Sequence, residues 1–480
     1  MNDLKNTEAG KEEKKNTGKM QKLEFRLGGV GRIIPICAAA VIILYAAFHQ
    51  SNVNGYVAAF FAAITVGVLF AKDGKAYGEA IVYGLSRPMF GVIVLAVILA
   101  AVSGKLIAGS GLIQTLAYYV INAGFSGRMF VAALFIITCI LAFSTGTSVG
   151  SYFVVIPILF PVGILAGIAP EYLIGAIVSG AAFGDNLGPI SDTTIASSGT
   201  QKAELGRVVK SRTRYSIPAA IGALIMFLIF TKTGNNTDSL SVDMEIIPNF
   251  TSFGMLIIPV VIIILCLMRK HLITALSCGI LSGIAVSLLT GIYSFDEILA
   301  FPGGFKVTGL FLDAILGTSG TVMMLIAVFA LLGVMERSGL FEDAGRILIK
   351  HTGSARKAEG AIVMSVGILS MITGVISVAI VALGDIVREV GSKVGLDPYR
   401  RANLLDCTGC VFCFLAPWTV HCVIPAQLSL QFGEEYGVVP QEIPFVNFYS
   451  ICMLFILMFS ICTGYGRTYN IEETQSKSCE

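Results

Sequence analysis

The sequence predicts an all-α polytopic membrane protein with two inverted-topology repeats and broken or re-entrant helices. Three observations support this fold class: the composition, the recurrence of apolar segments, and an internal repeat at a constant offset. Hydrophobic residues make up 55% of the 480 residues, and charged residues make up only 13%. This balance excludes an ordinary soluble globular domain and is typical of a chain that crosses a membrane many times.

Apolar segments long enough to cross a bilayer recur along the whole chain. About fourteen segments of roughly 16–22 residues are present, and because a re-entrant hairpin does not cross, we expect about 10–14 transmembrane segments. The segments 171–200 and 402–428 contain Gly-Pro and Ala-Pro pairs, which predict broken helices. Residues 1–31 are polar and rich in lysine, and we predict a disordered cytoplasmic tail there.

Basic residues predict the orientation, because cytoplasmic loops are enriched in Lys and Arg. With the N-terminus inside and the sides alternating, 29 of the 33 basic residues (33 − 4) fall in the cytoplasm. Those placed inside include Arg212, Arg400 and Arg401. The four placed outside are Lys105, Arg128, Lys232 and Lys306. We therefore expect a multi-pass membrane protein with both termini cytoplasmic.

The chain repeats itself at an offset of 228 residues (338 − 110). The matching landmarks are Ser110-Gly111-Leu112 with Ser338-Gly339-Leu340, Thr145-Gly146 with Thr373-Gly374, Pro170 with Pro398, and Pro189 with Pro417. This offset predicts a first transmembrane repeat at 32–231, an extracytoplasmic linker at 232–250, a second repeat at 251–465 and a cytoplasmic tail at 466–480. An odd number of crossings in each copy inverts the second copy, an arrangement typical of secondary transporters.

The first break runs from Gly184 to Thr194 and carries carboxylates, hydroxyls and an amide directly after an apolar run. Proline ends a regular helix, so Gly188 and Pro189 are predicted to free backbone carbonyls. Oxygen ligands without soft donors suit a small hard cation. We expect the ion or proton to bind at Asp185, with support from Asp192, Asn186, Ser191, Thr193 and Thr194.

A carboxylate buried in an apolar segment is the usual mark of a functional site in a membrane protein. If a proton and a metal ion compete for the Asp185 carboxylate, the chain exchanges one for the other. The alternative is that the segment is a boundary loop in which Asp192 caps a helix. This alternative applies more readily to Asp192 than to Asp185, since the basic loop begins near Asp192, at Lys202.

The stretch GDNLGPISDTTIAS resembles the signature of the NhaC family of sodium/proton antiporters, in the wider ion transporter superfamily. Residues Gly184 to Thr194 match the family pattern throughout, and Thr145-Gly146-Thr147-Ser148 is similar to its Gly-Thr-Ser segment. The resemblance implies exchange of external protons for internal sodium or lithium. The family also includes sodium-dependent exchangers of malate and lactate, and relatives suspected of carrying amino acids. Asn186 stands where some members have histidine.

Further site residues are expected at the other interruptions of the apolar segments. Thr147 and Ser148 line the ion site or form a tight turn, and their counterparts are Thr373 and Ser377. In the second copy Asp406 and Thr408 precede a break at Pro417, and we expect this segment to close the site from the other side. Asp385 either serves as an intramembrane acid or pairs with Arg388 one turn on.

Sodium/proton antiport is the function that these features favour, with no catalytic residues, no cofactor and no nucleic-acid partner. The alternative is a sodium- or proton-coupled carrier or exchanger of a small carboxylate or an amino acid. A remote alternative is a metal-binding redox membrane protein. It would use Cys407, Cys410 and Cys413 with His421-Cys422, but the sequence has no second cysteine cluster to complete a ligand set. The expected partners are the two ions, the lipid bilayer and a second copy in a homodimer.

Overall fold

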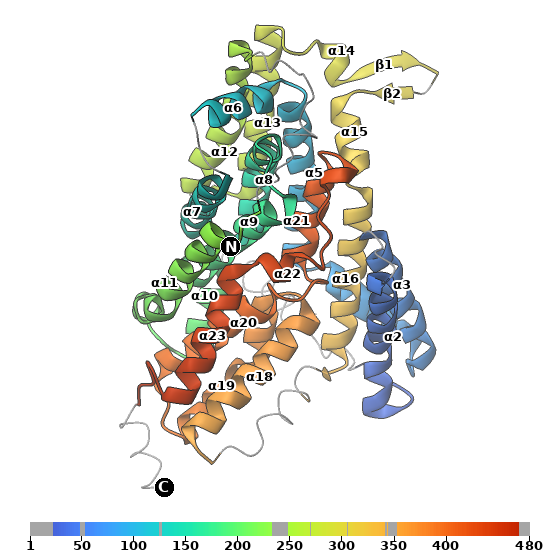
Figure 1. The fold of residues 1–480 in the computed structure, drawn as a ribbon. Coiled ribbons are helices and arrows are strands. Elements are labelled where there is room, and N and C mark those ends of the chain that lie inside the picture. Colours follow the sequence, from blue (N-terminus) through green and yellow to red (C-terminus); the bar gives the residue numbers. More distant parts are fainter. Residues whose placement is uncertain are drawn as a thin grey trace, which may run out of the picture.

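The computed structural model describes residues 23–48, 53–123, 127–232, 248–268, 270–304, 306–340, 343 and 353–469 (Figure 1). The described chain is almost entirely helical, as predicted. Its N-terminal helices are α2 (Gly28–Phe48), α3 (Val53–Phe70), α4 (Gly74–Leu85), α5 (Pro88–Ala108) and α6 (Leu112–Asn122). Most of residues 1–31, the 233–247 part of the predicted linker and the tail from 470 lie outside the described residues.

The predicted N-terminal tail is too long, because residues 23–31 have defined structure. Leu23 and Phe25 are buried against Tyr77 and Ala80 of α4. Phe25 also forms an isolated bridge with Ala71. Burial of two large apolar side chains holds this segment against the helices, and α2 then begins at Gly28 rather than after residue 31.

The middle of the chain contains the first broken helix and a small hairpin. The next helices are α7 (Gly127–Thr145), α8 (Ser148–Leu165), α9 (Pro170–Leu187), α10 (Asp192–Thr200) and α11 (Leu205–Phe230). They are followed by η1 (Phe250–Leu256), α12 (Ile257–Leu267), α13 (Leu272–Thr290), α14 (Phe295–Ile298), β1 (Ala300–Gly303), β2 (Lys306–Thr308), α15 (Leu310–Gly317) and α16 (Ser319–Arg337). The two strands pair antiparallel and project at the upper right of Figure 1.

The C-terminal part repeats the helix boundaries of the first copy. Its elements are α18 (Ala355–Thr373), α19 (Ile376–Lys393), α20 (Pro398–Phe412), α21 (Val420–Leu430), η2 (Glu434–Tyr436), α22 (Ile443–Val446) and α23 (Phe448–Thr463). The first residues of α18, α19, α20 and α21 each lie 228 positions after those of α7, α8, α9 and α10 (for α19, 376 − 148). Two units of secondary structure therefore follow the offset found in the sequence.

The two units pack against each other reciprocally. Helix α10 of the first copy contacts α19 of the second, and α21 of the second copy contacts α8 of the first. The hairpin α7–α8 lies in the upper half of Figure 1 and the hairpin α18–α19 in the lower half. Matching elements thus approach a common centre from two ends, although the inversion of the copies relative to a membrane stays a prediction.

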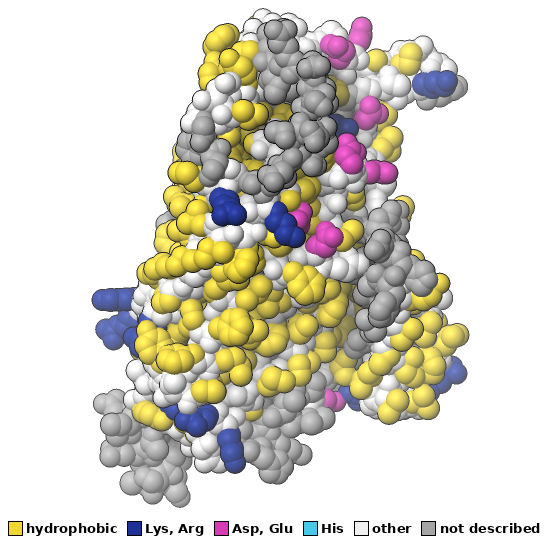
Figure 2. Space-filling view, in the orientation of Figure 1, with side chains coloured by type: hydrophobic (Ala, Val, Ile, Leu, Met, Phe, Trp, Pro, Cys, Tyr) yellow, Lys and Arg dark blue, Asp and Glu magenta, His cyan; other side chains and the backbone are white. Residues whose placement is uncertain are grey.

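The outer surface suits a bilayer. Along α11, Ile217, Ile221 and Ile225 are between 47% and 53% exposed, and their spacing of four places them on one face. Hydrophobic side chains cover a broad area across the middle of the view in Figure 2. A soluble monomer rarely exposes such a continuous apolar area.

Eight helices of the described part are long and apolar enough to cross a membrane. This is fewer than the predicted 10–14 segments, for two physical reasons. Four further apolar helices are shorter, among them Val420–Leu430 and Phe448–Thr463. Helices α18 and α19 carry several charged residues each, such as Glu359 and Arg388, and so lack the composition of a simple span.

Three arginines assigned to cytoplasmic loops are instead buried in the protein. Arg212 and Arg401 have no exposed surface, and Arg400 is 1% exposed. The Arg400 Nε atom lies 2.8 Å from Glu359, which also pairs with Arg467 at 2.6 Å. These contacts join α18 and α20 to the segment that follows α23. Loop composition could not distinguish a buried, paired arginine from a solvated one.

Candidate functional site

The break between α9 and α10 is where the sequence predicted it. Helix α9 ends at Leu187, Gly188 adopts an extended conformation (φ −62°, ψ 119°), and α10 begins at Asp192. The Gly188 N–H still donates to the Gly184 carbonyl at 2.7 Å, so the helix is closed up to the break. Pro189 then prevents a further turn, because it has no N–H to donate.

The tip of the α7–α8 hairpin presses against this break. Gly146 has φ +67°, and a Cβ atom there would lie 2.9 Å from the Ile190 carbonyl carbon. Only glycine adopts this conformation freely and permits such a close approach. The tip therefore delivers the start of α8, including Ser148, directly to the carboxylate on α9.

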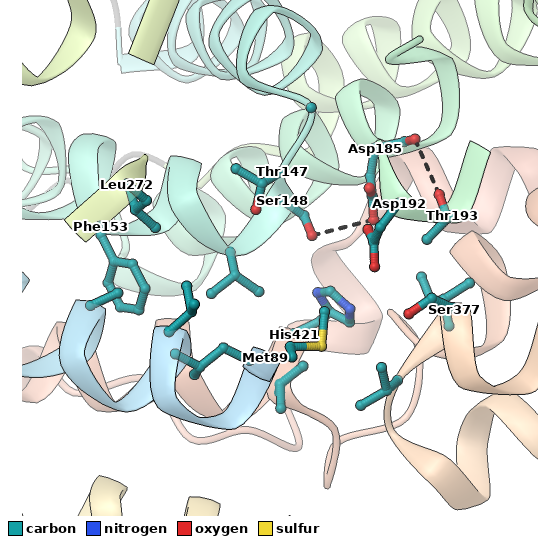
Figure 3. A pocket seen from close by; sticks show the side chains of 18 of the residues that line it. Met89, Thr147, Ser148, Phe153, Asp185, Asp192, Thr193, Leu272, Ser377 and His421 are labelled. Carbon is teal, nitrogen blue, oxygen red and sulfur yellow. Dashed lines mark hydrogen bonds between the residues drawn. The ribbon is translucent and has the colours of Figure 1, made fainter. Parts of the chain in front are cut away.

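Among the described residues, hydroxyl groups hold the Asp185 carboxylate, and no lysine or arginine pairs with it. The carboxylate is only 3% exposed. Ser191 donates to Oδ1 at 2.5 Å, and Ser148 donates to Oδ2 at 3.3 Å. Thr193 lies 2.9 Å from the Ser191 hydroxyl and donates to the Asp185 backbone carbonyl at 3.5 Å (Figure 3). The break thus gathers six oxygen atoms of four residues around one side of α9.

A cavity of about 330 Å³ lies beside these oxygens. Asp185, Asp192, Thr193, Thr147 and Ser148 line it from the first copy. Asp192 is an exposed residue of α10 and directs its carboxylate into this space (Figure 3). The cavity therefore has two carboxylates on its wall.

Matching positions of the two copies line this cavity. The pairs separated by 228 residues are Thr147 with Val375, Ser148 with Ile376, Val149 with Ser377, Asp192 with Val420, and Thr193 with His421. The cavity therefore lies where equivalent parts of both repeats meet. The chemistry is unequal, because only Ser377 and His421 provide polar groups from the second copy.

His421 is a cavity residue that the sequence analysis considered only for metal binding. Its ring stacks on Phe414 with centroids 3.9 Å apart, and Nδ1 lies 3.4 Å from the Tyr152 hydroxyl. His421 is 5% exposed and lines the cavity, and in Figure 3 its ring lies just below the two carboxylates. The signal that could have found it is its offset from Thr193 in the signature motif.

Asp406 lies outside the cavity lining, in a separate buried cluster. Its Oδ2 atom is 2.8 Å from Arg212 Nη1, and neither side chain has exposed surface. Ser197 and Asn186 donate to the same carboxylate, each at 3.1 Å. The role of Asp406 as an ion ligand stays a prediction, and the structure surrounds this carboxylate with donors from the protein.

Asn186 and Thr194 belong to this second cluster and not to the cavity wall. Arg212 Nη1 donates to the Asn186 carbonyl at 2.5 Å and to the Thr194 hydroxyl at 2.9 Å. The Asn186 side-chain oxygen accepts from Tyr449 at 3.1 Å and from Ser216. Arg212 is the functional candidate that the sequence missed, since it satisfies a carbonyl next to the break.

The remaining predicted residues fall at several places. Thr147 caps α8 by accepting from the Gly150 N–H at 3.2 Å. The Thr373 hydroxyl donates to the carbonyl of Val375 in its own turn, at 3.0 Å. Thr408 is buried, and its hydroxyl has no partner among the described residues. Pro417 lies in the interruption between α20 and α21, which is the second predicted break.

The structure also places Asp385 and the cysteines of the second copy. Asp385 is 84% exposed and pairs with Arg388 at 2.8 Å, so its alternative as a surface ion pair is the correct one. Cys407, Cys410, Cys413 and Cys422 are buried free thiols. The part of the chain that the structure describes has no group of three or more His, Cys, Asp or Glu arranged to hold a metal ion.

Comparison with known proteins finds several antiporters to which the chain is similar in sequence. The model of the Na+/H+ antiporter family matches residues 27–232. The malate-2H(+)/Na(+)-lactate antiporter of Bacillus subtilis is 27% identical over 375 residues, covering 75% of this chain and 80% of that protein. The Na(+)/H(+) antiporter NhaC of the same organism is 25% identical, covering 73% and 80%. NhaC of Alkalihalophilus pseudofirmus is 23% identical, covering 75% and 80%. The matches confirm the resemblance found in the signature motif: the chain is similar to the NhaC sodium/proton antiporters over about three quarters of its length.

Proposed function

We propose that the protein exchanges sodium or lithium ions for protons across the membrane, with Asp185 as the carboxylate for which the two ions compete. The observation that carries this proposal is the setting of Asp185. It is a buried acid with only hydroxyl partners, on the wall of a cavity shared by both repeats. Its own charge is left for a mobile ion to neutralise.

The ligand chemistry supports a hard monovalent cation. Carboxylate and hydroxyl oxygens come together at Asp185, Ser191, Thr193 and Ser148. Such oxygens suit sodium or lithium, and neutral hydroxyls complete the shell without adding charge. When the metal ion leaves, a proton on the carboxylate removes the cost of a bare buried charge. Binding of one ion therefore disfavours the other.

Asp192 gives the cavity a second carboxylate, so the exchanged charges need not be equal. Asp192 and Asp185 face one space, whereas Asp406 is neutralised by Arg212. If two protons replace one sodium ion, each cycle moves one net charge. That charge contributes about 2.3 kcal/mol per 100 mV of membrane potential.

The setting of the protein follows from this function. We propose a bacterial inner-membrane location, cytoplasmic termini and a homodimeric assembly. Transport itself would need no bound cofactor. The sodium gradient and the proton gradient would drive each other through the same cavity.

Everted membrane vesicles with a pH-sensitive dye test the proposal. Addition of sodium should dissipate a preformed proton gradient in vesicles that contain the protein, and Asp185→Asn should abolish the response. Asp313→Asn is the matched control, because Asp313 is an exposed acid at the start of α15. If the Asp185→Asn protein keeps full sodium-dependent exchange, the assignment of the coupling carboxylate is wrong.

A second candidate is exchange of a small organic acid together with sodium and protons. It is favoured by the volume of the cavity, about 330 Å³, which is more than a single bare ion needs. It also fits the activity for which the malate-2H(+)/Na(+)-lactate antiporter of Bacillus subtilis is named. Uptake of labelled malate and lactate into the same vesicles decides between the two. Two results together would favour this candidate: uptake of the organic acid requires sodium, and sodium does not dissipate the proton gradient when no organic acid is present.

A further inference from the structure

The cavity beside Asp185 has two chemically different ends. Asp185, Asp192, Thr193 and Ser148 form the polar end. The cavity is also lined by apolar side chains from α5, α8 and α13, which are Met89, Val92, Ile93, Ala96, Phe153 and Leu272. In Figure 3, Phe153 and Leu272 lie at the left, away from the carboxylates. A bare ion needs only the polar end, so the apolar end is surface that an ion does not use.

The charge of the lining selects the sign of a ligand. Two carboxylates face the cavity, and no lysine or arginine is among the described residues that line it. Arg212, which is buried nearby, is already paired with Asp406 at 2.8 Å. An organic anion would meet like charges there, whereas a cation would be attracted.

His421 adds a third polar group that can bind a ligand. The side chain is 5% exposed, and its one hydrogen bond within the described chain involves Nδ1 and the Tyr152 hydroxyl. Nε2 is therefore unengaged by the described protein on the cavity wall. In the tautomer that carries its proton on Nδ1, Nε2 accepts a hydrogen bond.

We propose that this cavity also binds small primary ammonium ions with a compact aliphatic body. The ammonium group takes the place of sodium, so this inference rests on the proposed sodium site. Its three N–H donors match three acceptor groups, which are the carboxylates of Asp185 and Asp192 and the imidazole of His421. The aliphatic body lies against Ile93, Phe153 and Leu272 at the apolar end.

This binding mode predicts a dependence on chain length. Each methylene group moved from water to the apolar end contributes about 0.8 kcal/mol, which is a roughly fourfold gain in affinity. The gain should continue from methylammonium to n-butylammonium and stop once the apolar end is full. A ligand held by its charge alone would show no such series.

The test is displacement of radioactive sodium from the purified protein by methyl-, ethyl-, n-propyl- and n-butylammonium. Purified protein is preferable to vesicles, because neutral amines cross membranes and collapse a pH gradient by themselves. We expect each added methylene to strengthen displacement about fourfold. The neutral alcohols of the same lengths should displace nothing. Equal displacement by all four ammonium ions would overturn the inference.

Two leucine variants separate the cavity from a general affinity for detergent or lipid. Leu272→Ser should flatten the chain-length series, with each variant normalised to its own sodium affinity. Leu267→Ser is the matched control, since Leu267 is 52% exposed and lines an outer apolar groove between α7, α8 and α12. A series that is flattened equally by both substitutions contradicts the inference. Failure of the wild-type protein to bind sodium would instead remove the proposed function, and this inference with it.

Discussion

Asp185 and Asp406 are both buried acids near the same broken helix, but their partners differ in kind. Asp185 accepts from the neutral hydroxyls of Ser191 and Ser148, whereas Asp406 is paired with the guanidinium of Arg212. Residue 186, the immediate neighbour of Asp185, belongs to the Asp406 cluster. The C-terminal end of α9 therefore contributes to two regions. In one region the carboxylate has neutral partners, and in the other it is paired with a positive charge.

The difference in partners suggests different roles for the two carboxylates, one in ion binding and one in stabilising the broken helix. A buried carboxylate with an arginine partner is permanently neutralised, while one with hydroxyl partners needs a mobile cation or a proton. Arg212 also donates to Asn186 and Thr194, on either side of the break. We infer that the Asp406 cluster holds the break in shape while the cavity exchanges ions.

The largest effect should come from breaking the Arg212–Asp406 pair. Arg212→Ala leaves an uncompensated buried charge and should destabilise the protein by about 3–5 kcal/mol. Asp406→Asn in the same chain removes that charge and should restore much of the lost stability. Thermal unfolding of the purified single and double variants measures both effects. If the double variant is as unstable as the sum of the single variants, the two residues are not coupled.

The next effect concerns the hairpin tip that supports the cavity region. Gly146→Ala forces a side chain into a left-handed conformation and against Ile190, at a cost of about 1–3 kcal/mol. We expect the tip to withdraw and sodium-dependent exchange to fall at least tenfold. Gly199→Ala is the control, because a Cβ atom there meets no other atom within 4 Å. Full activity of the Gly146→Ala protein would show that the tip need not touch the break.

Much of the cavity region could be predicted from sequence, because proline and glycine act locally. Gly188 and Pro189 mark the break, and an acid after an apolar run identifies Asp185. The 228-residue offset also anticipated the helix boundaries of α18 to α21. These features are patterns of residues along the sequence, so they can be recognised without knowledge of the tertiary structure.

The support region could not be predicted, because its partners are distant in sequence. Arg212 and Asp406 are 194 residues apart (406 − 212). Arg212 also lies among loop-like basic residues, where composition favours a solvated side chain. His421 was considered only as a metal ligand for a similar reason, since its place on the cavity wall depends on packing against Tyr152 and Phe414. Tertiary packing, not local pattern, decides both cases.

Loss of a single hydroxyl group that bonds to Asp185 should weaken sodium binding, which would distinguish the cavity from the Asp406 cluster. Ser191→Ala removes the hydrogen bond of 2.5 Å and should raise the sodium concentration for half-maximal exchange about tenfold, since a bond to a charged group contributes about 1.5 kcal/mol or more. Ser148→Ala, at 3.3 Å, should have a smaller effect. Ser144→Ala is the control, because its hydroxyl bonds only to the Ile140 carbonyl of its own helix. Equal effects at all three positions would argue against a hydroxyl-built site.

The smallest effect should come from the second copy's side of the cavity. His421→Phe keeps the ring stacked on Phe414 but removes both nitrogens. The proposed sodium ligands come from the first copy, so we expect sodium-dependent exchange to change by no more than about threefold. The effect should be smaller than that of Thr193→Val at the matching position, where a hydrogen-bonded hydroxyl is lost. Vesicle assays over a series of sodium concentrations measure both variants. Tyr152→Phe, which removes only the hydroxyl beside Nδ1, should resemble His421→Phe. If His421→Phe is instead as damaging as Asp185→Asn, the second repeat supplies a coupling group, and the inequality between the copies disappears.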